Sequence, residues 1–150
     1  MSGLRRTGRM PSALQLDYRF RWGLYAIFSV LCVTGAVWLI ADALKESANR
    51  EFWQATSAAL LMVHGGAAMM TLVLLGALIP VHILRAWRSR KNRLTGTVMA
   101  TANLLLVATA FGLYYAGSEA LRPYISDAHI AVGLAFPALF VIHVVTGRRR

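Results

Sequence analysis

Cysteine and negative charge are both scarce in this sequence. Cys32 is the only cysteine among 150 residues, which excludes an intrachain disulfide, a cysteine-rich zinc site and a C-x-x-C-H site for covalent haem attachment. Six acidic residues stand against sixteen basic ones, and charged residues make up only 15% of the chain. Hydrophobic residues make up 57%, which is too apolar for a soluble domain of this length. The composition therefore predicts a membrane protein with no separate soluble catalytic domain.

Four apolar stretches are each long enough to cross a membrane, which takes about 20 mainly apolar residues. Charged or turn-forming segments separate the expected spans, which are 22–44, 55–84, 94–117 and 128–147, and a basic tail, 1–21, precedes them. The Arg122-Pro123 pair is expected to keep the fourth helix from starting earlier, with Ser126 or Asp127 as its N-cap. We predict an all-α membrane protein, a single integral membrane domain over 1–150, folded as a four-helix up-and-down bundle.

The basic residues are distributed unevenly between the expected spans. Thirteen of the sixteen lie in the tail, in the loop between the second and third spans, or after the fourth: Arg5, Arg6, Arg9, Arg19, Arg21, Arg85, Arg88, Arg90, Lys91, Arg93, Arg148, Arg149 and Arg150. Lysine and arginine are retained on the cytoplasmic side, so both termini are predicted to be cytoplasmic. This distribution accounts for the net charge of +10 without a nucleic-acid partner. A cleaved signal peptide is a weaker interpretation of the first span, because its apolar run exceeds the usual h-region.

All four histidines lie in the second and fourth expected spans. His64 and His82 are 18 residues apart, which is five full turns at about 100° per residue, and His129 and His143 are 14 apart, about 40° short of four turns. Each helix therefore presents its two histidines on one face, and the two helices lie diagonally across an up-and-down bundle. Counted from the basic flanks, His64 and His129 form an outer pair, and His82 and His143 an inner pair.

The two spacings differ in length. Eighteen residues rise about 27 Å along a helix and fourteen rise about 21 Å. Helix tilt and local distortion at Pro80 and Pro137 are expected to absorb the difference.

Two histidines facing each other at one depth suit haem iron, which accepts axial ligands on both faces of a planar macrocycle. A zinc site needs three or four protein ligands, and the apolar interior offers no cysteine or carboxylate at the right depth to complete one. The competing interpretation is that intramembrane histidines only form hydrogen bonds between helices.

Four short motifs carry a family resemblance: VHGGAAMM around His64, PVHILRAW around His82, SDAHIAVG around His129 and VIHVVTG around His143. With them the chain resembles the small bacterial four-helix dihaem membrane cytochromes b, a group that includes cytochrome b561-like proteins and cytochrome b subunits of respiratory enzymes. The resemblance implies two haem b groups, the outer one ligated by His64 and His129 and the inner one by His82 and His143. It also implies electron transfer between the quinone pool or another redox donor and a periplasmic or membrane redox subunit, in the bacterial inner membrane.

Other roles remain open for a few charged residues and for the chain as a whole. Glu119, Arg122 and Asp127 could form a quinone site at the outer rim, but no motif supports one and N-capping is the better role for Asp127. Arg85 and Arg122 could pair with haem propionates, but topogenic and loop-surface charge is the favoured explanation of both. The alternative function is a haem-free membrane anchor or assembly subunit. A transporter with a histidine relay is least favoured, because the spans lack intramembrane carboxylates.

Overall fold

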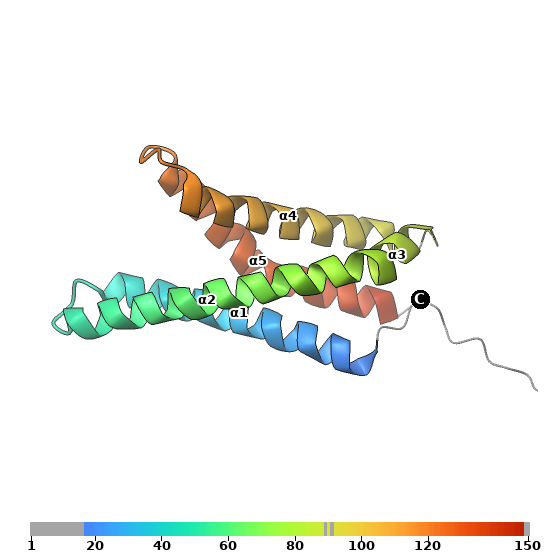
Figure 1. The fold of residues 1–150 in the computed structure, drawn as a ribbon, viewed down its shortest axis with the longest axis horizontal. Coiled ribbons are helices and arrows are strands. Elements are labelled where there is room, and N and C mark those ends of the chain that lie inside the picture. The colour runs from blue at the N-terminus through green and yellow to red at the C-terminus, as the bar shows by residue number, and fades with distance from the viewer. Residues whose placement is uncertain (1–16, 89, 91, 149–150) are drawn as a thin grey trace, which may run out of the picture.

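Four long helices dominate the structure, a computed structural model that describes residues 17–88, 90 and 92–148 (Figure 1). The elements in chain order are α1 (Tyr18–Leu44), α2 (Arg50–Leu78), the π-helix η1 (Ile79–Ile83), α3 (Leu84–Arg88), α4 (Arg93–Tyr115) and α5 (Arg122–Arg148). Helices α1, α2, α4 and α5 are each long and apolar enough to cross a membrane. The prediction of an all-α protein with four candidate membrane spans is therefore confirmed, while most of the expected basic tail lies outside the described residues.

The helices pair in the order in which they follow one another along the chain. Helix α1 packs along α2, α4 packs along α5, and α1 also touches α5. Figure 1 shows that successive long helices run in opposite directions. The start of α1, the connection from α3 to α4 and the end of α5 consequently lie at one end of the molecule, which we call the basic end because most of the described arginines lie there.

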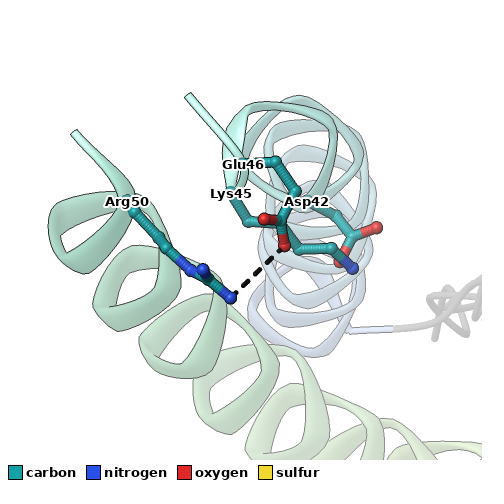
Figure 2. A network of polar contacts seen from close by, with 4 residues as sticks. All are labelled: Asp42, Lys45, Glu46 and Arg50. Atoms are coloured by element: carbon teal, nitrogen blue, oxygen red, sulfur yellow. Dashed lines mark hydrogen bonds and ion pairs between the residues drawn. The ribbon is translucent and has the colours of Figure 1, made fainter. Parts of the chain in front are cut away.

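The connection from α1 to α2, at the opposite end, carries a small group of charged side chains (Figure 2). Lys45 Nζ lies 2.9 Å from Asp42 Oδ1, and Arg50 Nη2 lies 3.7 Å from Glu46 Oε1. Because these side chains are substantially exposed, each pair contributes at most about 1 kcal/mol to stability. Acidic residues thus accompany both basic residues of this connection, Lys45 and Arg50.

The start of α5 differs from the sequence prediction. The helix begins at Arg122, with Pro123 in its first turn, so the expectation of a break followed by an N-cap at Ser126 or Asp127 was wrong. Proline is tolerated in the first turn because the N–H groups there have no partner within the helix. The backbone N–H groups of Leu121 and Arg122 both donate to Ser118 O at 3.2 Å, which closes the turn before the helix.

A small apolar core lies between the helices, and every long helix contributes to it. Its buried members are Leu24, Phe28, Leu78, Met99, Ala102 and Phe136. The Phe28 ring lies 5.1 Å from that of Phe136 and 5.3 Å from that of Phe140, measured between centroids. In the most apolar stretch of each long helix, at most 22% of the residues are buried, so most apolar side chains stay at least partly accessible to the surroundings, as a lipid environment favours.

Candidate functional site

The outer pair consists of His64 on α2 and His129 on α5. Their ring centroids are 6.3 Å apart and the ring planes are inclined at 75°. Both side chains are half-buried. In the described part of the chain, α2 and α5 show no extended backbone packing against each other, so the two imidazoles reach from one helix pair to the other.

The inner pair, nearer the basic end, consists of His82 in η1 and His143 on α5. The ring centroids are 6.2 Å apart, with an interplanar angle of 84°. Both histidines are again half-buried. The structure thus brings together the same two pairs that phase and depth indicated, and it does so with nearly equal separations.

These separations can be compared with two simple arrangements of imidazoles. A five-membered ring with C–N bonds of about 1.33 Å places each nitrogen about 1.1 Å from the ring centre. Two rings joined directly by a nitrogen–nitrogen hydrogen bond of about 2.9 Å would then have centres about 5.1 Å apart. Two rings that bind one metal ion from opposite sides, with metal–nitrogen bonds of about 2.0 Å, would have centres about 6.2 Å apart. The observed 6.3 and 6.2 Å match the second arrangement.

Threonine hydroxyls determine which ring nitrogen is available in the outer pair. Thr34 Oγ1 lies 2.9 Å from His64 Nδ1, and Thr109 Oγ1 lies 2.8 Å from His129 Nδ1. Each hydroxyl also donates its hydrogen to a carbonyl four residues earlier in its own helix, at 2.7 Å. A hydroxyl has one hydrogen, so a threonine that donates to its own helix can only accept a hydrogen bond from the histidine Nδ1–H. In that tautomer the neutral ring carries its lone pair on Nε2, the nitrogen that would then be able to bind a metal.

The inner pair is less fully supported. His143 Nδ1 lies 3.2 Å from Thr95 Oγ1, and that hydroxyl lies 3.3 Å from Asn92 O. His82 Nδ1 is buried and has no hydrogen-bond partner among the residues that the structure describes. In none of the four histidines does Nε2 form a hydrogen bond with another described residue. All four Nε2 atoms are therefore left available as ligands.

The π-helix η1 explains how His82 reaches the depth of His143. In η1 the N–H of Leu84 donates to Ile79 O, five residues earlier. A π-helix has more residues per turn than an α-helix, so the same number of residues advances less along the helix axis and the following side chains are rotated about it. The distortion expected at Pro80 is confirmed, because Pro80 lies in η1 and has no N–H to give to a regular ladder.

The supporting threonines were missed by the sequence analysis. Thr95 and Thr109 are 14 residues apart on α4, the same spacing as His129 and His143 on the neighbouring α5. Such a match between polar positions of two adjacent spans was the available signal.

A glycine allows α1 to approach the outer pair closely. A Cβ added at Gly35, the residue after Thr34, would lie only 3.3 Å from His64 Cε1. The absence of a side chain at Gly35 therefore lets α1 lie against the His64 ring.

Each histidine pair offers two protein ligands. No group of three or more histidine, cysteine or carboxylate residues that could hold a metal ion occurs within 17–88, 90 and 92–148. A planar macrocycle that supplies four equatorial nitrogens would complete a two-histidine site, whereas zinc would lack ligands. The donor set therefore fits haem.

The charged residues considered for quinone or propionate binding lie at the helix ends. Glu119 precedes α5, Arg122 begins it and Asp127 lies two residues before His129, all with exposed side chains. Arg85 lies in α3, three residues after His82, and is also exposed. The structure thus places them near the two sites along the chain, and their binding roles stay predictions.

Comparison with family models, with curated proteins and with solved structures found no match. The fold and the site define an α-helical protein with four candidate membrane-spanning helices and two facing histidine pairs.

Proposed function

We propose that this protein is a b-type membrane cytochrome that carries electrons through two haems. His64 and His129 would be the axial ligands of one haem, and His82 and His143 those of the other. The observation that carries the proposal is the separation of the rings, 6.3 Å in one pair and 6.2 Å in the other, which fits one metal ion between two imidazoles.

The residues of the chain have separate tasks in this proposal. The four Nε2 atoms would bind the iron, while threonine hydroxyls contact Nδ1 of three of the rings, those of His64, His129 and His143. Haem b supplies one-electron oxidation and reduction when bound. With two histidine ligands supplied by the protein at each site, the haems would be suited to electron transfer rather than to binding of a further ligand.

The distance between the pairs supports transfer across a membrane. His129 and His143 are separated by fourteen residues of α5, a rise of about 21 Å, against about 30 Å for the hydrocarbon core of a bilayer. The apolar core, with Phe28 and Phe136, occupies the region between the pairs. Two haems held by these histidine pairs would together span most of the distance between the two membrane surfaces.

The surroundings of the protein are part of the same proposal. The basic end faces the cytoplasm, because lysine and arginine are retained there, and the chain lies in a bacterial inner membrane in contact with lipid. It transfers electrons between the quinone pool, or another redox donor, and a partner redox subunit. Short connections between the helices leave little soluble surface of its own for such exchange.

Absorption spectroscopy tests the proposal directly. Purified full-length protein should give a reduced-minus-oxidised spectrum of b haem, with two haems per chain by pyridine haemochrome. His64→Ala and His129→Ala should each remove the same haem and leave the other, since the two residues share one iron. Folded protein without stoichiometric haem would overturn the proposal and favour the haem-free membrane anchor. Loss of different haems in the two variants would refute the pairing.

A further inference from the structure

The hydroxyls behind the outer pair have a specific task. We propose that Thr34 and Thr109 are positioning residues that fix the Nδ1–H tautomer of His64 and His129, so that both Nε2 lone pairs are ready before a metal centre binds. This inference rests on the proposed function for the nature of that centre. The tautomer itself depends only on the hydrogen bonds of the chain.

The direction of each hydrogen bond is determined by the helix that carries the threonine. In the α-helix, Thr34 Oγ1 donates to Val30 O at 2.7 Å, and Thr109 Oγ1 donates to Leu105 O at 2.7 Å. With its hydrogen engaged, the hydroxyl offers only lone pairs to the histidine. A histidine with the hydrogen on Nε2 would place two lone pairs against each other and lose this bond.

Each supporting threonine lies on the helix packed directly against the helix of its histidine. Helix α1 holds His64 of α2, and α4 holds His129 of α5, so each ring is oriented within one closely packed helix pair. Neither hydrogen bond depends on how the two pairs of helices approach each other. Both imidazole rings of the outer pair are consequently held in orientation, His64 by α1 and His129 by α4.

The inner site lacks this arrangement. Its single threonine bond, from His143 Nδ1 to Thr95, is 3.2 Å long, and Nδ1 of His82 has no partner among the described residues. A hydrogen bond donated by Nδ1–H, the ring nitrogen that does not bind the metal, raises the basicity of a ligating imidazole and favours the more highly charged metal ion. The outer haem should therefore be held more tightly and have a lower reduction potential than the inner one.

The variant Thr34→Val removes the hydroxyl while keeping the shape of the side chain. We expect outer-site haem affinity to fall about 10- to 100-fold, as for other outer-shell partners of metal ligands. Where ferric haem loses tenfold more affinity than ferrous haem, the outer midpoint potential rises by about 59 mV. The inner midpoint should not move, and Thr34→Ser should restore wild-type behaviour because it restores the acceptor.

Thr71→Val is the matched control. Thr71 is 6% exposed and its Oγ1 donates to Ala67 O at 2.9 Å, so this variant loses a buried hydroxyl and an intrahelical bond without touching a histidine bond. An outer midpoint and haem affinity that respond equally to Thr34→Val and Thr71→Val would overturn the inference.

The tautomer can also be measured without a variant. The full chain with 15N-labelled histidine, in nanodiscs, has only four imidazoles, and their nitrogen shifts distinguish Nδ1–H from Nε2–H. We expect Nδ1–H for His64 and His129 in the presence or absence of haem. A sample that binds no haem but shows these tautomers would refute the proposed function and retain this inference. Nε2–H at either residue would refute the inference, whatever the haem content.

Discussion

The close contact between Gly35 and His64 gives a sharp test of the outer site. Substitution by alanine adds a Cβ that would lie 3.3 Å from His64 Cε1 and 3.7 Å from Nδ1. The first distance is shorter than ordinary van der Waals contact, so the ring must move by a few tenths of an ångström. The same ring is held by Thr34 at 2.9 Å and faces His129 at a centroid separation of 6.3 Å. A shift of the ring disturbs both.

Two opposing energies determine the size of the effect. Replacing glycine by alanine in a helix interior favours the folded state by about 0.5–1 kcal/mol. Overpacking against a well-held neighbour costs about 1–3 kcal/mol. At Gly35 both terms apply, whereas at Gly23, on the same helix, a Cβ meets nothing within 4 Å and only the first applies. Gly35→Ala should therefore be less stable than Gly23→Ala by about 1–3 kcal/mol.

The assay compares the two variants for thermal unfolding in detergent and for haem retained at each site. Gly35→Ala should unfold earlier than Gly23→Ala and lose outer-site haem preferentially, with the inner signal retained. Gly35→Leu should abolish outer-site binding, because its larger side chain occupies the space of the ring. Equal stability and equal haem content in the two alanine variants would show that α1 does not press on His64, and the structural reasoning would fail.

Two further predictions concern the inner pair and the packing of α4 on α5. His82→Ala and His143→Ala should each remove one and the same haem, shown by a reduced-minus-oxidised spectrum that keeps the outer signal; different residual spectra would contradict their pairing. Gly112→Ala places a Cβ 3.1 Å from Ile125 Cγ2, while Gly96→Ala on the same helix meets nothing within 4 Å. The first should lower thermal stability relative to the second by about 1–3 kcal/mol, and an equal melting temperature would argue against this helix contact.

Hydrophobic runs and histidine phase predicted much of this arrangement, because both depend on a single helix. Apolar length alone identified α1, α2, α4 and α5 as candidate spans, and the angular spacing of His64 and His82 placed them on one face. The start of α5 was misjudged, because the Arg122-Pro123 pair was taken as a break before the helix, whereas a proline can also stand in a first helical turn.

The supporting threonines could not be derived in the same way. Whether Thr34 reaches His64 depends on the rotation of α1 against α2 and on their close approach at Gly35. Hydropathy does not determine either quantity, since the lipid-facing and helix-facing sides of these spans are both apolar. A threonine in such a span otherwise satisfies its hydroxyl with its own helix, as Thr71 does, so Thr34 alone carries no mark of function in the sequence. Only the spacing of Thr95 and Thr109, which matches that of the α5 histidines, offered a signal.

The π-helix links the unequal histidine spacings to the difference between the two sites. Pro80 has no N–H, so a regular α-helical ladder is already interrupted there, and η1 widens at little further cost. His64 and His82 are 18 residues apart, whereas His129 and His143 are only 14 apart. The wider turn of the π-helix takes up part of this difference and lets His82 lie opposite His143. Among the residues that the structure describes, His82 Nδ1 is buried and has no hydrogen-bond partner, and a buried unpaired polar group costs about 1–3 kcal/mol. The π-helix thus brings His82 opposite His143, and the pair that results is the less rigidly oriented of the two.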